Sequence, residues 1–130
     1  MGLYIMQKIT TIFFLFIAFS SYGQVEIESQ DIANFIGKEV KVKAKVAGIF
    51  DKGAMVIAFN MVENYPKQVF QAIIYKDKAE LFGDLKRFEG KEVTLNGKVS
   101  LYPKVLEKDG KRKQYFQIIL NNAKQIELIN

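Results

Sequence analysis

The order of short alternating segments along the chain constrains its fold more than any other feature. Residues 39–50, 54–61 and 69–75 carry apolar side chains at every second position, the pattern of half-buried β-strands. Residues 76–82 fit a short helix, and residues 93–101 and 115–120 return to the alternating pattern. Residues 125–129 could add a short last strand. The expected order is therefore three strands, a helix and two strands.

Turn signals separate these segments. Gly37-Lys38-Glu39-Val40 opens the first strand, and Gly90-Lys91-Glu92-Val93 opens the fourth. Asp51-Lys52-Gly53 and Asp109-Gly110 predict tight turns, and Gly97 inside the fourth strand indicates a bend or bulge. A small barrel with this order of elements is an OB fold. We therefore predict an all-β, five-stranded Greek-key OB-fold barrel with a short helix between its third and fourth strands.

The predicted core consists of the inward residues of these strands. Met55 and Met61 should point inward with the alternating apolar residues of the second strand, while the helix would plug one end of the barrel through Leu81 and Phe82. The expected core residues are Val42, Val46, Ile57, Phe59, Phe70, Ile74, Val93, Leu95, Val99, Phe116, Ile118 and Leu120.

The first residues have the pattern of a secretory signal peptide. Lys8 supplies a positive charge, residues 9–19 are almost wholly apolar, and residues 20–23 contain the small residues typical of a cleavage site. The apolar run is about a dozen residues, shorter than the roughly 20 that cross a bilayer. We expect residues 1–23 to be a cleaved leader, with a single domain over residues 24–130 in the periplasm or outside the cell and no stable membrane span after cleavage. An uncleaved anchor is the alternative.

Composition narrows the class further. The chain has no cysteine, which excludes disulfides and a lipid-modified Cys anchor. Its 19 basic and 14 acidic residues give a net charge of +5, which falls to +4 when Lys8 leaves with the leader. This mild excess permits an anionic partner, but solubility explains it as well. Whether Met1 or Met6 is the true start stays open.

Catalysis and metal binding lack their usual residues. The chain has no histidine and no cysteine, and its carboxylates do not form a cluster with ligand spacing. Arg87 and Arg112 are its only arginines, too few for a nuclease-like site. We therefore expect a protein that is not an enzyme and that has no catalytic residues, metal site or cofactor.

Several short motifs are distinctive: Gly37-Lys38-Glu39-Val40, Phe59-Asn60-Met61, Tyr65-Pro66-Lys67-Gln68-Val69-Phe70, Phe82-Gly83-Asp84 and residues 90–102. With these motifs the chain resembles a family of small exported bacterial OB-fold proteins, related to the tRNA-anticodon-type OB domains that bind nucleic acid. The resemblance covers residues 31–129. The chain departs from the family pattern at Tyr75, where relatives often carry Trp. It departs again at residues 107–113, which lengthen the loop between strands four and five.

OB folds bind ligands across their second and third strands and the bordering loops. Tyrosine rings interleaved with cations suit single-stranded nucleic acid, because bases stack on the rings and phosphates meet the cations. Structural roles are the alternative: Tyr65 and Tyr102 could cap the barrel, and residues 111–113 could be a solvated hairpin tip. The candidate ligand-binding residues are Asn60, Tyr65, Lys67, Gln71, Tyr75, Tyr102, Lys104, Lys111, Arg112, Lys113 and Tyr115.

The leading interpretation is a non-catalytic binding module for single-stranded nucleic acid or an oligonucleotide. The alternative is an envelope or stress-related OB barrel that binds a small molecule, a glycan or a protein partner. An interaction scaffold without a soluble ligand is a third reading.

Overall fold

The structure is a computed structural model that describes residues 24–51, 53, 55–106 and 112–129. The predicted strands and helix occur in the predicted order, with one further strand ahead of them and other short helices along the described chain, and every described helix has 3₁₀ geometry. The elements are β1 (Val25–Ile27), η1 (Ser29–Phe35), β2 (Glu39–Phe50), β3 (Val56–Met61), β4 (Phe70–Tyr75), η2 (Lys76–Phe82), η3 (Leu85–Phe88), β5 (Glu92–Leu106), β6 (Arg112–Ile119), η4 (Ala123–Gln125) and β7 (Ile126–Leu128).

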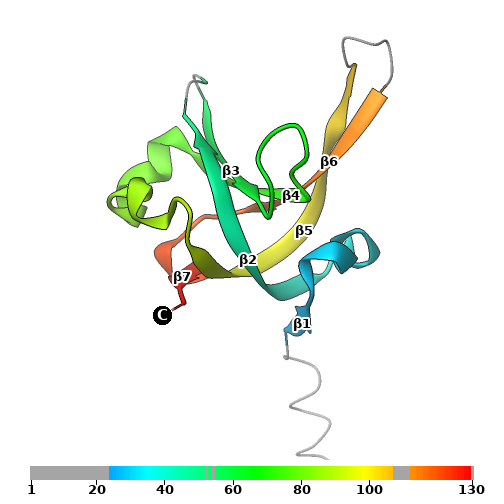
Figure 1. The fold of residues 1–130 in the computed structure, drawn as a ribbon, viewed down its shortest axis with the longest axis horizontal. Coiled ribbons are helices and arrows are strands. Elements are labelled where there is room, and N and C mark those ends of the chain that lie inside the picture. The colour runs from blue at the N-terminus through cyan, green and yellow to red at the C-terminus, as the bar shows by residue number, and fades with distance from the viewer. Residues whose placement is uncertain (1–23, 52, 54, 107–111, 130) are drawn as a thin grey trace, which may run out of the picture.

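The strands pair in a ring around one core (Figure 1). β2 pairs with β3 and β3 with β4, both antiparallel, and β4 pairs with β6 in parallel. The ring continues through antiparallel pairs of β6 with β5 and of β5 with β2. β1 and β7 extend the sheet beside β2 and β5. The all-β barrel prediction is confirmed, and β1 is a strand that the alternation did not indicate.

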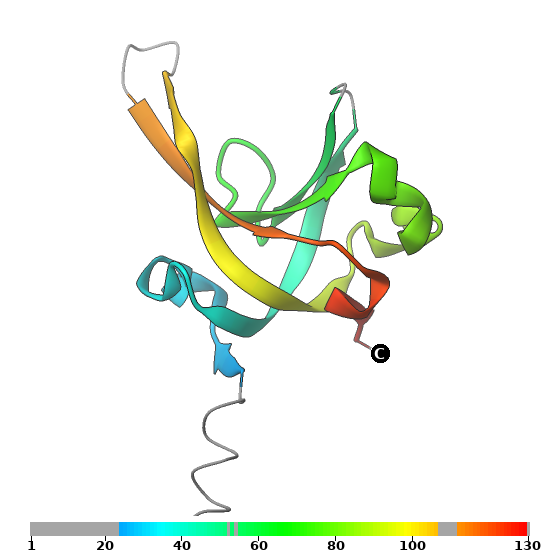
Figure 2. The same ribbon diagram turned by 180° about the vertical axis from the view of Figure 1, so that it is seen from behind.

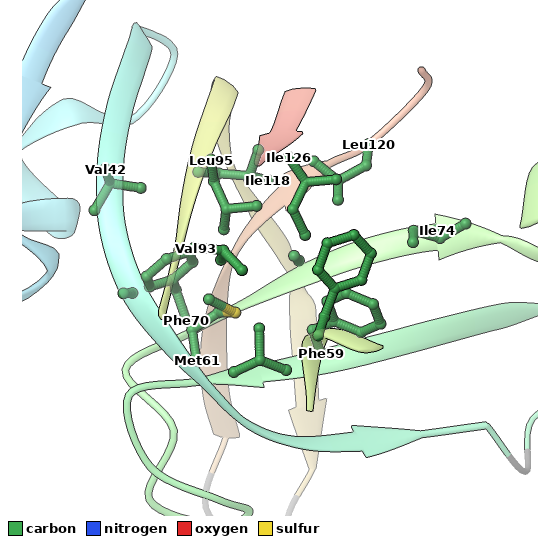
Figure 3. Packing of buried hydrophobic residues seen from close by; sticks show 14 of the residues in the cluster. Val42, Phe59, Met61, Phe70, Ile74, Val93, Leu95, Ile118, Leu120 and Ile126 are labelled. Atoms are coloured by element: carbon green, nitrogen blue, oxygen red, sulfur yellow. The ribbon is translucent and has the colours of Figure 1, made fainter. Parts of the chain in front are cut away.

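The core fills this ring (Figure 3). Every predicted core residue is buried except Phe116, which is half-buried. The rings of Phe59 and Phe88 pack with centroids 5.9 Å apart. Met55 was wrongly placed inside, because it is 72% exposed, and Leu81 of η2 is 58% exposed. Phe82 and Phe88, from η2 and η3, supply the apolar contacts that the predicted single helix was expected to make.

A β-bulge near the end of β2 reverses which of its side chains point toward the core. The register against β3 moves from Val46↔Met61 to Gly48↔Asn60, which leaves Ala47 as the extra residue. One inserted residue reverses the side-chain alternation. Phe50, an even number of positions after Val46, therefore lies opposite Ala58 on the outer face and is 51% exposed.

Gly97 marks a close contact, not a bulge. The register of β5 against β2 runs without a shift from Glu39↔Lys98 to Lys45↔Glu92. A Cβ built on Gly97 would stand 2.6 Å from Cγ2 of the buried Ile118. Only glycine therefore fits this position without movement of the core.

β5 and β6 continue beyond the barrel as a long hairpin (Figures 1 and 2). η1 and the pair η2–η3 lie on opposite sides of the barrel in both views. None of the helices in the described ranges is long and apolar enough to cross a membrane.

Candidate ligand-binding groove

A row of polar residues crosses the outer face of the barrel. The strand registers place Asn60 of β3 opposite Gln71 of β4, Gln71 opposite Gln117 of β6, and Gln117 opposite Ser100 of β5. Their chain neighbours Phe59, Phe70, Ala72 and Ile118 all belong to the core. Because side chains alternate along a strand, the polar row faces away from the core.

Three amide side chains at one end of this row form a hydrogen-bonded chain. Nε2 of Gln71 donates to Oδ1 of Asn60 over 2.9 Å, and Nδ2 of Asn60 donates to Oδ1 of Asn64 over 3.0 Å. The backbone N–H of Tyr65 donates to the same Asn64 oxygen over 2.9 Å. Asn60 is only 4% exposed, so these bonds satisfy a buried amide.

The Tyr65 N–H fixes the orientation of all three amides. A backbone N–H can only donate, so the Asn64 atom that it meets must be oxygen. Asn60 must then present its nitrogen to Asn64 and its oxygen to Gln71, and Gln71 must present its nitrogen to Asn60. Within the described part of the chain, Oε1 of Gln71 accepts no hydrogen bond, and Nδ2 of Asn64 donates none. One acceptor and one donor group therefore stay available to a ligand.

These amides line a groove of about 580 Å³, which we call the amide groove. Its volume lies in the range of roughly 300–1,000 Å³ that is usual for ligand sites. Two exposed aromatic rings stand at it, Phe50 at 51% and Tyr65 at 61% exposure. The described lining residues are Ala47, Gly48, Ile49, Phe50, Asn60, Asn64, Tyr65, Gln71 and Glu89. It thus combines flat apolar surfaces with polar groups of fixed direction.

The loop that carries Tyr65 is held to the barrel by backbone hydrogen bonds. The N–H of Val62 donates to the Lys45 carbonyl over 2.8 Å, and the N–H of Val69 donates to the Met61 carbonyl over 3.2 Å. Within the loop, the N–H of Lys67 donates to the Asn64 carbonyl over 2.9 Å, and the Tyr65–Pro66 peptide bond is cis. Tyr65 is therefore exposed but positioned by its surroundings.

The structure brings some of the sequence-predicted site residues together and separates others. Asn60, Tyr65 and Gln71 share the amide groove, whereas Lys67 is exposed on the same loop without lining it. Tyr75 points outward as expected and is 40% exposed, but it lines two other grooves. The predicted site is therefore divided between at least two places on the barrel.

The remaining predicted residues, apart from Lys111, belong to β5 and β6. Tyr115 is half-buried on β6 and pairs in register with Tyr102 of β5. Lys111 lies outside the described residues. The backbones of Tyr102, Lys104, Arg112 and Lys113 belong to β5 and β6, and their side chains lie outside what the structure describes.

Sequence reasoning missed Phe50, Asn64 and Glu89 at the amide groove. Phe50 faces outward only because of the bulge at Ala47, and the sole available signal was the small Ala47-Gly48 pair inside an otherwise regular strand. The role of Asn64 depends on the fold of its loop, which has no periodic pattern. Glu89 follows η3 and comes to the groove from a distant part of the sequence.

A second groove of about 420 Å³ lies between β1, η1 and β2, lined by Glu26, Glu28, Asp31, Lys41, Lys43 and two apolar residues. Its charges partly compensate one another, as in the exposed Lys41–Glu26 pair at 3.9 Å. Across the described ranges, no three Asp or Glu side chains gather in a way that could hold a metal ion. The amide groove is the stronger candidate, because its polar groups are fixed by hydrogen bonds and accompanied by exposed rings.

Comparison with known proteins supports the fold. No protein-family model and no curated protein matches the chain. Two OBodies bound to hen egg-white lysozyme, AM2EP06 and AM1L10, superpose with TM-scores of 0.54 at 21% and 19% identity, over 84% of this chain and 96% and 97% of theirs. An aspartyl-tRNA synthetase from Entamoeba histolytica matches with a TM-score of 0.51 at 16% identity, over 84% of this chain and 22% of the synthetase. The chain therefore has an OB-type fold, as its sequence predicts.

Proposed function

We propose that the protein is a non-catalytic binding module that holds single-stranded nucleic acid in the amide groove. The observation that carries this proposal is the combination of exposed Phe50 and Tyr65 rings with the oriented Asn64 and Gln71 amides in one groove. Stacking of a base on an aromatic ring contributes about 1–3 kcal/mol. The free acceptor and donor groups match the edges of bases, which carry both donors and acceptors.

Two ring substitutions test the proposal. Phe50→Ala and Tyr65→Ala should each weaken binding of a labelled single-stranded oligonucleotide by about 1–3 kcal/mol. Fluorescence anisotropy measures the affinity, and urea unfolding should show nearly unchanged stability because both rings are exposed. Leu81→Ala is the matched control, since Leu81 is 58% exposed on η2 and lines none of the grooves described above. Equal affinities for all four proteins would refute this role of the groove.

A protein partner is the second candidate. Glu89 is the one charged residue among those described around the amide groove, and a carboxylate disfavours a phosphate beside it. The OBodies of the same fold are bound to lysozyme, a protein. Binding that is insensitive to salt would favour this candidate, or a glycan or small molecule, because phosphate contacts make nucleic-acid binding salt-dependent.

We further propose that the protein is exported and that residues 1–23 are removed, on the basis of the apolar run and the small residues that follow it as in a cleavage site. Mass spectrometry of the protein recovered from the periplasm or medium should then give an N-terminus at Gln24 or within a residue or two. Recovery of the intact chain from washed membranes would instead show an uncleaved anchor.

A further inference from the structure

Tyr75 lines a further groove on the outer face, distinct from the groove between β1, η1 and β2, and we call it the tyrosine groove. It measures about 430 Å³ and lies over β4, β5 and β6. Its described lining residues are Glu39, Tyr75, Gly97, Lys98, Ser100, Ile119, Asn121 and Gln125. Like the amide groove, it offers an exposed ring beside hydrogen-bonding side chains.

The polar row connects the two grooves. Asn60 and Gln71 line the amide groove, Ser100 lines the tyrosine groove, and Gln117 lies between them in register with both Gln71 and Ser100. Gln117 is 9% exposed, and its side chain makes no hydrogen bond to the described residues. Neighbouring strands lie about 4.8 Å apart, so the path from Asn60 on β3 to Ser100 on β5 is about 14 Å. A ligand in both grooves must therefore be a chain that crosses the strands.

The two grooves also differ in charge. Among the described residues, no Lys or Arg lines the amide groove, whereas Lys98 lines the tyrosine groove. Nζ of Lys78 lies 3.1 Å from Oδ1 of Asn121, another lining residue. Glu39 lies opposite Lys98 in the β2–β5 ladder and offsets one of these charges. The described lysines Lys98 and Lys78 thus lie at the tyrosine groove, whereas no described Lys or Arg lines the amide groove.

We propose that the tyrosine groove is a second subsite for the same strand of nucleic acid, with a base on Tyr75 and a phosphate near Lys98 and Lys78. This inference rests on the proposed function and specifies its ligand as an oligonucleotide of several nucleotides that runs across β3, β4, β6 and β5. A mononucleotide in the amide groove would leave the second subsite empty.

Length dependence provides the test. An unlabelled dinucleotide and a labelled octanucleotide of the same base are titrated into the wild type and into Tyr75→Ala, the first followed by NMR and the second by anisotropy. Tyr75→Ala should weaken octanucleotide binding roughly 5- to 150-fold, the range for loss of one stacked base. Dinucleotide binding in the amide groove should stay unchanged, because Tyr75 does not line that groove.

Charge provides an independent readout. The double variant Lys78→Gln/Lys98→Gln should reduce the salt slope of octanucleotide binding by roughly 0.7 for each lost phosphate contact. Lys86→Gln, an exposed lysine on η3 that lines neither groove, is the control and should keep the wild-type slope.

The outcomes separate the two proposals. If the dinucleotide binds but the octanucleotide gains nothing, or if Tyr75→Ala and the lysine variant behave as wild type, the second subsite is refuted and the amide groove stands. If neither oligonucleotide binds the wild type at low salt, the proposed function and this inference both fail.

Discussion

Asn64 lies directly over Gly48: a Cβ built on Gly48 would stand 2.6 Å from Oδ1 of Asn64. Gly48 follows the bulged Ala47, so the β2 bulge and the missing side chain together make room for the Asn64 amide. That amide accepts from Asn60 and from the Tyr65 N–H. One glycine therefore permits the hydrogen bonds that orient the amide groove.

Gly48→Ala should impair binding more than stability. The new methyl group would displace the Asn64 side chain, whose end can rotate away, with the loss of two hydrogen bonds worth about 0.5–1.5 kcal/mol each. Replacing glycine by alanine in a strand returns roughly 0.5–1 kcal/mol. We expect the unfolding free energy to fall by at most about 2.5 kcal/mol, with a clear loss of oligonucleotide affinity. Gly53→Ala, where the nearest atom is 3.5 Å away, is the control for both measurements.

Gly97→Ala should destabilise the barrel. Its Cβ would meet Cγ2 of Ile118 at the same 2.6 Å, but Ile118 is fully buried in the core and cannot turn aside. Overpacking of this kind costs about 1–3 kcal/mol. Urea unfolding should show that loss. The stability losses of Gly97→Ala, Ile118→Ala and the Gly97→Ala/Ile118→Ala double variant should not be additive, because the two residues are in contact. Strictly additive losses would contradict the predicted clash.

Asn60→Asp tests the direction of the amide chain. An ionised Asp at this position can accept from Gln71 but cannot donate to Oδ1 of Asn64, which the Tyr65 N–H holds in place. The two oxygens would repel each other in a site that is 4% exposed. We expect a stability loss of about 1–3 kcal/mol at neutral pH, the usual penalty for an unsatisfied buried group. Asn34→Asp, on the exposed part of η1, should be nearly neutral.

The loss of stability caused by Asn60→Asp should depend on pH. Burial and the facing oxygen raise the pKa of the introduced carboxyl above its value in the unfolded chain, because both disfavour the charged form. The protonated carboxyl can donate to Asn64, so stability is retained in acid. It falls as the pH rises above the unfolded pKa, and the loss is complete above the raised folded pKa. Urea unfolding across a pH series measures this, and a pH-independent difference from wild type would contradict the assigned orientation.

The basic hairpin tip gives a prediction that rests on sequence. Replacing Lys111, Arg112 and Lys113 by Ala should weaken nucleic-acid binding and flatten its salt dependence, since each lost phosphate contact reduces the slope. Anisotropy over a salt series checks it. An unchanged slope would mean that the hairpin cations are simply solvated.

The barrel could be predicted because its strands carry a strong period of two. Val40, Val42, Ala44 and Val46 alternate with lysines, and this pattern alone places β2 with one face in the core. β1 was missed because Val25–Ile27 is too short to show a period. Local alternation also cannot show that Met55 lies ahead of the strand that starts at Val56, so its side chain was wrongly placed inside.

The groove was harder to predict than the barrel because it depends on exceptions to the pattern. Asn60 and Gln71 could be placed side by side from their strand positions, and the register confirms this. Phe50 faces outward through a bulge of one residue, and Asn64 reaches Asn60 through a loop. Tyr75 was assigned to the same site as Tyr65, but it lies four residues beyond Gln71, at the other end of β4, and lines other grooves.

The side-chain amide signals of Asn60, Asn64 and Gln71 offer the most direct test of the account. Two-dimensional NMR of the labelled protein, titrated with a single-stranded oligonucleotide at low salt, reports on these groups individually. We predict progressive shifts of the Asn64 and Gln71 amide signals together with backbone shifts at Phe50 and Tyr65, reversed by added salt. Unchanged spectra at saturating oligonucleotide, or shifts confined to residues away from this groove, would contradict it.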